Sequence, residues 1–301
     1  MAGKNSKKLK TAFCYLCLFF LLFSCASAPK PDTFYKGRSG FGLMPEGASF
    51  YLMAEVQSVR PILDSLVFGG MSGAEIKDFL DMSDELTLAA FQNPGDRHFY
   101  AAAAGKFPNV GGGLFFSTSK DWEKKTSASG MPYWYSAKSM LSVSINARAA
   151  YLSDADPFVK GPGAKVPEAL VAMQKGAVLS GWMNDPSGAI KKLIASFEIP
   201  IEIPAERFLF AIYSEDENNL YTATLRFEMA SNTQAAGLVG IFSLARLGIA
   251  FADFSEHKEM ETLAKAFFSR NPAQDGNALV LQTGKISGKD LALLFNIISV
   301  Y

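Results

Sequence analysis

The residue types that most often carry catalysis are few and scattered in this sequence. His98 and His257 are its two histidines, and they lack the short spacing with which zinc ligands occur along a chain. Ser117–Lys120 fits the Ser-x-x-Lys spacing of one class of serine nucleophile, but the companion motifs Ser-Asp-Asn and Lys-Thr-Gly are absent. Asp154 and Asp156 suit glycosidase chemistry only at a particular separation of their carboxyl groups, and decorating a turn is the more common role. We therefore expect no enzyme activity, no metal site and no cofactor.

Cys25 is the residue whose neighbours point most clearly to chemistry. Four lysines lie within Lys4–Lys10, an uncharged apolar run follows over Ala12–Phe23, and the small residue Ser24 directly precedes the cysteine. A basic leader, a short apolar run and a small-residue cleavage site are the layout of a secretory signal peptide. The apolar run is shorter than the roughly 20 residues that a membrane-spanning helix needs. The sequence therefore predicts an exported chain.

The four residues Leu22-Phe23-Ser24-Cys25 resemble the signal of bacterial lipoproteins, in the relaxed form found in spirochaetes. The resemblance covers Met1 to about Pro31. It implies that residues 1–24 are a cleaved signal peptide and that the Cys25 sulfur carries a lipid anchor, with palmitate among its acyl chains. It also implies a place in the cell envelope, and Ala26 favours the outer membrane by the sorting rule of enteric bacteria. The alternative is an ordinary signal cleaved after Ala28, which would discard Cys25.

Composition narrows the classes of partner. The full chain balances 29 basic against 29 acidic residues, so loss of the four signal-peptide lysines leaves a mildly acidic body without a basic run. Such a body argues against nucleic acid and against electrostatic attachment to anionic lipid. No cysteine follows Cys25, so the exported body has no disulfide and folds on its hydrophobic core. We expect membrane lipid as a partner, and the sequence leaves any protein partner unknown.

Residues 25–44 are predicted to form a lipidated tether. This stretch holds two prolines and three glycines, which favour neither helix nor strand. The alternative is an irregular arm in which Phe34, Tyr35 and Phe41 dock onto the body, because aromatic residues are unusual in flexible linkers.

The rest of the chain contains one internal repeat of its pattern of elements, which predicts two halves over 45–160 and 161–301. Each half begins with a strand-like run, at 47–53 and at 176–182, followed by a helix start with a proline in its first turn. Two turn-linked runs follow in each half and predict β-hairpins. The offset between the halves is 129 positions at Gly47 and Gly176 and 122 positions at Leu86 and Phe208.

These patterns predict an α+β fold. Duplicated strand-helix-strand-strand units are expected to form a mainly antiparallel sheet with packed amphipathic helices. Short strands of a meander are also expected in the first half, at 122–126, 133–137, 141–145 and 149–152. In the second half, the added segments are expected to be helical.

The segment 231–251 is the strongest candidate for a functional element. Ser231 and Gln234 form a capping box, and Arg246 is the one charged residue between Glu228 and Asp253. A helix that is apolar on every side is either buried or meets lipid. The more common interpretation is a central core helix; the functional one is a contact with membrane lipid or with an apolar ligand. The candidate contact residues are Leu238, Ile241, Phe242, Leu247 and Phe251.

Together these observations predict a lipid-anchored envelope lipoprotein without enzymatic activity, which contacts membrane lipid or an apolar ligand through apolar helices. The tether and the apolar helices are similar to those of spirochaete envelope lipoproteins, some of which engage the outer membrane through amphipathic helices. That resemblance carries over no functional residues. The alternatives are a periplasmic or surface binding module for a protein or glycan partner and a purely structural envelope protein. Tyr133-Trp134-Tyr135 is the candidate glycan surface, although such residues more often brace a hairpin.

Overall fold

The computed structural model describes most of the chain after residue 39. The described residues are 40–64, 67–68, 71–72, 77–93, 96–107, 116–128, 130–158, 163–187, 203–216, 219–249 and 258–292. The predicted signal peptide, Cys25 and the tether up to residue 39 lie outside these residues, as do Phe251 and His257.

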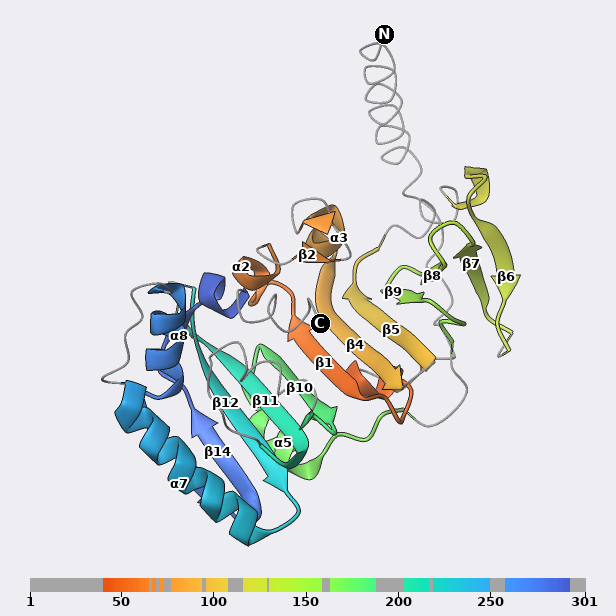
Figure 1. The fold of residues 1–301 in the computed structure, drawn as a ribbon. Coiled ribbons are helices and arrows are strands. Elements are labelled where there is room, and N and C mark those ends of the chain that lie inside the picture. Colours follow the sequence, from red (N-terminus) through yellow and green to blue (C-terminus); the bar gives the residue numbers. More distant parts are fainter. Residues whose placement is uncertain are drawn as a thin grey trace.

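One antiparallel sheet of thirteen strands dominates the described chain (Figure 1). Its strand order is β13-β14-β12-β11-β10-β1-β4-β5-β9-β8-β7-β6, and β15 also pairs with β12. The strands are β1 (Phe50–Glu55), β4 (Ser83–Asn93), β5 (Asp96–Gly105), β6 (Glu123–Thr126), β7 (Pro132–Ser136), β8 (Leu141–Ile145), β9 (Ala149–Ser153), β10 (Leu179–Asn184), β11 (Ala205–Asp216), β12 (Leu220–Met229), β13 (Ala273–Asp275), β14 (Ala278–Gln282) and β15 (Ile286–Ser287). A separate two-stranded ribbon pairs β2 (Val67–Phe68) with β3 (Met71–Ser72).

The helices of the described chain are mostly short. They are η1 (Gly40–Leu43), α2 (Arg60–Leu63), α3 (Lys77–Asp81), α5 (Glu168–Met173), α7 (Asn232–Ile249) and α8 (Lys258–Phe267), and residues 116–118 and 288–292 are also helical. The predicted α+β fold of duplicated units with packed amphipathic helices is therefore wrong, because the chain is mostly one large sheet with few short helices. The reason is visible at Pro61, where the proline begins a helix as expected but α2 ends at Leu63. A proline marks where a helix starts and carries no information on how far it continues.

Several of the predicted strand pairings, unlike the predicted fold class, are present in the structure. Both predicted hairpins are present, since β4 pairs with β5 and β11 pairs with β12, in each case antiparallel. The predicted meander is also confirmed, since β6, β7, β8 and β9 pair in sequence order. Runs of apolar and β-branched residues separated by turn residues were a reliable signal because each strand pairs with its neighbour in sequence.

At the centre of the sheet, β1 and β10 pair with each other, and each is flanked on its outer side by a hairpin, β4–β5 beside β1 and β11–β12 beside β10. Leu52 of β1 pairs with Gly181 of β10, which lies 129 positions later in the chain. Their outer partners, Leu88 of β4 and Phe210 of β11, are 122 positions apart. A side chain at position 181 has no room, because a Cβ there would lie 2.2 Å from the Tyr51 carbonyl oxygen and 2.8 Å from the Phe210 ring. The glycine therefore lets β10 pack closely against β1 and β11 at the centre of the sheet.

The two sides of the sheet carry different layers. Because side chains alternate along a strand, Phe210, Phe227 and Leu279 lie on one side, which we call the α7 face. Helices α7 and α8 cover part of this side and bury apolar clusters with it. The other side carries Tyr51, Trp182 and Leu209 and is called the α5 face. There η1, α5, Phe158, Ala164 and Val166 complete a second cluster.

The last residues of the predicted tether belong to this second cluster. Phe41 is 3% exposed and its ring meets that of Trp182 edge-on, with centroids 4.7 Å apart. Met44 is also buried. The Tyr51 hydroxyl donates a hydrogen bond to the Pro45 carbonyl oxygen and accepts one from the Ala48 amide, at 2.8 Å each. The docked-arm alternative therefore holds for Phe41, whereas Phe34 and Tyr35 lie outside the described residues.

Candidate functional site

Helix α7 forms where the capping pattern places it. It spans Asn232–Ile249, and the Ser231 hydroxyl accepts a hydrogen bond from the Gln234 amide at 3.3 Å. This contact satisfies one of the amide groups that a helix start leaves without an intrahelical partner. The helix lies along the outer part of the sheet, beside β14 (Figure 1).

The inward side of α7 packs on the sheet through small and medium apolar residues. Ala235 and Leu238 are 0% and 4% exposed, in a cluster with Phe227 and Leu279. Further along the helix, Phe242 stacks on Phe268, with ring centroids 5.8 Å apart. These contacts bury one stripe of the helix and fix which side faces away from the protein.

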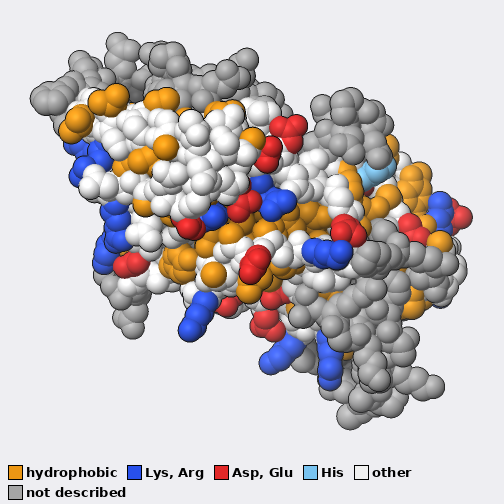
Figure 2. Space-filling model, turned by 90° about the horizontal axis from the view of Figure 1, so that it is seen from below, with side chains coloured by type: hydrophobic (Ala, Val, Ile, Leu, Met, Phe, Trp, Pro, Cys, Tyr) orange, Lys and Arg blue, Asp and Glu red, His pale blue; other side chains and the backbone are white. Residues whose placement is uncertain are grey.

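The outward side of α7 is apolar and open. Ile241, Leu244 and Leu247 are 40%, 70% and 62% exposed. After the polar first turn of the helix, the other exposed residues are small: Ala236, Gly237, Gly240 and Gly248. Figure 2, which views the molecule from below, shows hydrophobic side chains exposed among charged ones on the lower side of the molecule. The interpretation of α7 as a central core helix is therefore wrong, since the helix lies at the surface with apolar residues on both of its sides.

The single charge of α7 is held away from this outward side. The Arg246 guanidinium donates a hydrogen bond from Nε to the Phe268 carbonyl oxygen at 2.9 Å and from Nη1 to Asn271 Oδ1 at 2.5 Å. Both acceptors belong to the turn that follows α8. The outward surface, defined as Ala236, Gly237, Gly240, Ile241, Leu244, Leu247 and Gly248, is consequently uncharged.

The five residues predicted for apolar contact divide between the two sides. Leu238 is buried and Phe242 packs inward, whereas Ile241 and Leu247 lie on the outward surface. Phe251 lies outside the described residues. Sequence reasoning missed Leu244, the most exposed of the three large outward residues. Nothing in a helix that is apolar all around indicates which side the sheet covers, so this residue had no signal of its own.

No helix among the described residues is both long and apolar enough to cross a bilayer. The described chain also holds no group of three or more His, Cys, Asp or Glu side chains arranged to bind a metal ion.

The polar residues considered for catalysis serve as local braces. Asp154 accepts the Phe99 amide at 3.1 Å and lies 3.4 Å from His98 Nδ1. Asp156 accepts the amides of Phe158 and Ala128 at 2.9 and 3.1 Å. Both carboxylates thus hold turns at strand ends, which is the interpretation that sequence favoured.

The aromatic group Tyr133-Trp134-Tyr135 also braces its own hairpin. The Trp134 ring stacks near Phe116, with centroids 6.0 Å apart. The Lys125 ammonium lies 4.1 Å from the centroid of the Tyr135 ring, a cation–π contact between adjacent strands. These contacts support the interpretation as hairpin bracing over that as a glycan surface.

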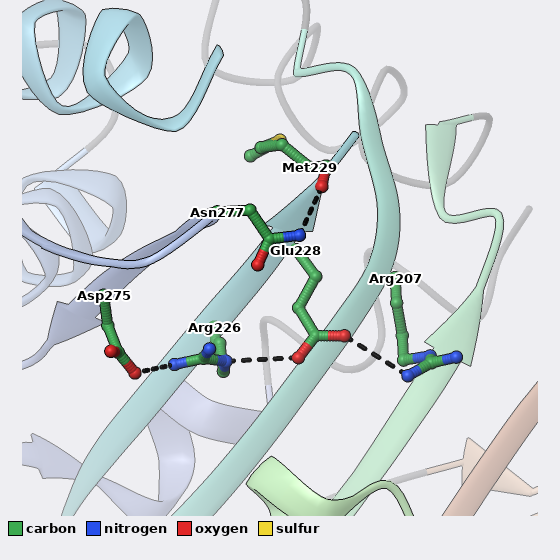
Figure 3. Close-up of polar contacts among 6 residues, drawn as sticks. All are labelled: Arg207, Arg226, Glu228, Met229, Asp275 and Asn277. Carbon is green, nitrogen blue, oxygen red and sulfur yellow. Dashed lines mark hydrogen bonds and ion pairs between the residues drawn. The ribbon is translucent and has the colours of Figure 1, made fainter. Parts of the chain in front are cut away.

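A ladder of charges crosses the α5 face at the far end of β12 (Figure 3). Glu228 lies between two guanidinium groups, 3.2 Å from Arg226 and 3.3 Å from Arg207. Arg226 also contacts Asp275 of β13 at 2.5 Å. In the same view, the Asn277 side-chain amide donates to the Met229 carbonyl oxygen at 2.6 Å. The ladder ties β11, β12 and β13 together beside the sheet edge.

Comparison with known proteins gives a likeness of fold. No family of proteins matches the sequence, and no curated protein matches it. Crystal forms III, IV and I of TP0453, a spirochaete protein of Treponema, resemble this structure. Form III has 16% sequence identity and a TM-score of 0.60, and the alignment covers 87% of this chain and 99% of the TP0453 chain. Form IV has 17% sequence identity and a TM-score of 0.61, and the alignment covers 88% of this chain and 99% of the TP0453 chain. Form I has 17% sequence identity and a TM-score of 0.57, and the alignment covers 86% of this chain and 97% of the TP0453 chain. At this identity the likeness is one of fold.

Proposed function

We propose that this chain is a non-enzymatic, lipid-anchored lipoprotein of the cell envelope whose outward α7 surface contacts membrane lipid. The observation that carries the proposal is the exposure of Ile241, Leu244 and Leu247 on an uncharged helix surface. An exposed apolar patch of this kind marks a surface that contacts a membrane or a partner. The likeness of fold to a spirochaete protein agrees with the relaxed lipoprotein signal at Cys25.

The energetics favour two membrane contacts acting together. One acyl chain on Cys25 gives marginal and reversible attachment. Moving the exposed part of Leu244 or Leu247 out of water contributes about 1–2 kcal/mol for each side chain, and every 1.4 kcal/mol is roughly a tenfold change in partition. The α7 surface therefore adds a second membrane contact to the acyl chains on Cys25, and it also holds the body close to the bilayer.

The experiment that tests this proposal separates α7 from the anchor. The mature chain, residues 25–301 with Cys25→Ser, is mixed with neutral phosphatidylcholine vesicles and floated on a density gradient. We expect the protein to float with the vesicles. A Leu244→Ser, Leu247→Ser double variant is expected to lose vesicle binding by about 100-fold, roughly tenfold for each side chain.

Val171 supplies a matched control. It lies on α5, across the sheet from α7, and is 58% exposed. A Val171→Ser variant removes a comparable exposed apolar side chain, so its flotation is expected to equal that of the parent protein. A parent protein that stays in the soluble fraction, or an equal loss in both variants, contradicts the α7 assignment.

The anchor has its own test. Mass spectrometry of the native protein is expected to show an acylated Cys25 as the first residue, and a Cys25→Ala variant is expected to lose both the acyl label and the membrane fraction. An unmodified N-terminus beyond Cys25 would contradict the lipoprotein assignment while leaving the α7 experiment interpretable.

A further inference from the structure

A polar depression lies on the α5 face, where β11, β12 and β14 run side by side. Its volume is about 270 Å³. Eight residues line it: Tyr213, Glu215, Thr222, Ala223, Thr224, Arg270, Gln282 and Thr283. Ala223 is the one aliphatic residue among them, so the depression differs in kind from the outward surface of α7.

Strand register brings the polar side chains together. Tyr213 of β11 pairs with Thr222 of β12, and Thr224 of β12 pairs with Gln282 of β14. Because these pairs sit two residues apart on β12, all four side chains share one side of the sheet. Arg270, which follows α8, closes the group by donating a hydrogen bond from Nη1 to Gln282 Oε1 at 3.0 Å.

Hydrogen bonds within the group fix the side chains, and some donors and acceptors remain that can bind a ligand. The Thr222 hydroxyl donates to Glu215 Oε1 at 2.7 Å, and the Tyr213 hydroxyl donates to the Met173 carbonyl oxygen at 2.7 Å. The Tyr213 hydroxyl oxygen already accepts a hydrogen bond from Thr224. The Thr222 hydroxyl can still accept through its oxygen, and the Gln282 amide keeps two N–H donors. Arg270 is exposed and has four further N–H groups.

This inventory selects among ligand classes. Alternating donors and acceptors match vicinal hydroxyl groups, each of which both donates and accepts. An anion such as phosphate suits Arg270 but meets the Glu215 carboxylate, whose charge the solvent-exposed Lys285 ammonium balances only in part, at 3.9 Å from Oε2. An apolar ligand finds little to contact. The volume falls just under the roughly 300–1,000 Å³ of pockets for drug-sized ligands, so the ligand is small.

We propose that this depression binds a neutral saccharide unit, held by Thr222, Gln282 and Arg270. Glu215 acts as an acceptor for sugar hydroxyl groups, and the Tyr213 ring provides a flat wall beside the bound ring. The site lies across the sheet from α7, so the proposal is independent of membrane contact.

Titration of the mature chain (residues 25–301, Cys25→Ser) with glucose, galactose and N-acetylglucosamine tests the site by NMR chemical shifts. We expect saturable binding of at least one sugar, with a dissociation constant on the order of 1 mM. Gln282→Leu and Thr222→Val are each expected to weaken that binding tenfold or more. Thr262→Val, which changes an exposed threonine of α8, is the matched control and is expected to leave affinity unchanged.

Two results would overturn the proposal. The first is the absence of saturable binding of all three sugars up to roughly 50 mM, well above the expected constant, in a protein with an unchanged thermal transition. The second is inorganic phosphate binding more tightly than any sugar, which would assign the depression to anions. Should either strand variant fold poorly, Arg270→Gln serves instead, because Arg270 is exposed beyond the end of α8, and its affinity is again expected to fall about tenfold.

Discussion

The indole ring of Trp182 stacks on the phenol ring of Tyr51, with centroids 4.1 Å apart and 20° between the ring planes. The two residues are direct partners in the pairing of β10 with β1. Each ring also contacts Phe41, which lies in the short helix η1. This aromatic group therefore joins β1, β10 and the end of the predicted tether in a single buried cluster.

Removing the indole is expected to cost more stability than any surface change. Trp182 is 3% exposed, and truncation of a buried tryptophan to alanine costs about 3–5 kcal/mol. Urea denaturation of Trp182→Ala measures this loss. Trp122→Ala is the comparison, since Trp122 is only partly buried in a small cluster with Phe116. Equal losses in the two variants would show that the Trp182 cluster is not the centre of the fold.

Arg246 is expected to hold the C-terminal half of α7 against the turn after α8. Arg246→Gln removes the charge-assisted hydrogen bonds to Phe268 and Asn271, which contribute about 1.5–3 kcal/mol. Amide hydrogen exchange is expected to accelerate in the last two turns of α7 and to stay unchanged near Ala235. Arg246→Lys keeps the charge without the planar fork, so an intermediate rate is expected. Uniform acceleration along the whole helix would contradict this role.

Glu85 is expected to make stability depend on pH. Burial raises the pKa of the Glu85 carboxyl, and the nearby Glu55 charge adds to the rise, while hydrogen bonds from Thr87 and from the Gly40 amide oppose it. A raised native pKa means that the ionised form disfavours folding, so the native state gains stability as the pH falls through that pKa toward the ordinary value of 4.5.

The Glu85→Gln variant is therefore expected to be the more stable protein at pH 7–8, and its advantage is expected to shrink toward pH 4. The effect is under about 1 kcal/mol because solvent screens a partly exposed carboxyl. Thermal unfolding across this pH range measures it. Glu123→Gln, on an exposed side chain of β6, is expected to show no such trend, and a Glu85→Gln advantage that grows on acidification would reverse our assignment of the pKa direction.

The charge ladder of Figure 3 is expected to stabilise the sheet unequally along its length. The Asp275 side chain is 71% exposed, whereas that of Arg226 is 15% exposed. Asp275→Asn is thus expected to cost at most about 0.5 kcal/mol, less at high salt. Arg226→Met leaves Glu228 with one fewer donor and is expected to cost about 1–3 kcal/mol. Urea midpoints at low and high salt compare the two, and a larger loss for Asp275→Asn would contradict the ranking by burial.

Local patterns predicted much of the strand structure and little of the architecture. The hairpins β4–β5 and β11–β12 were readable because both partners are neighbours in sequence. The pairing of β1 with β10 joins residues such as Leu52 and Gly181 that lie far apart in the chain, and no local signal specifies it. The single sheet therefore could not be derived, although the offsets of 129 and 122 positions recur in its register.

The candidate site shows the same limit at the level of single residues. The capping residue Ser231 predicted the start of α7, and composition predicted an apolar helix. Which side of α7 faces outward depends on contacts with Phe227, Leu279 and Phe268, which come from distant parts of the chain. Leu244 and Phe242 are both large and apolar in sequence, and tertiary packing alone separates the outward residue from the inward one.

An environment-sensitive fluorophore at position 244 would report directly on whether the outward surface of α7 contacts lipid. The chain has no cysteine after Cys25, so Leu244→Cys in the Cys25→Ser mature chain creates a unique labelling site. Val171→Cys gives the matched label across the sheet. We expect phosphatidylcholine vesicles to shift the emission of the label at position 244 to shorter wavelength and to brighten it. The emission of the label at position 171 is expected to stay unchanged. An emission at position 244 that vesicles leave unchanged, or an equal shift at both positions, would contradict a lipid contact through the outward surface of α7.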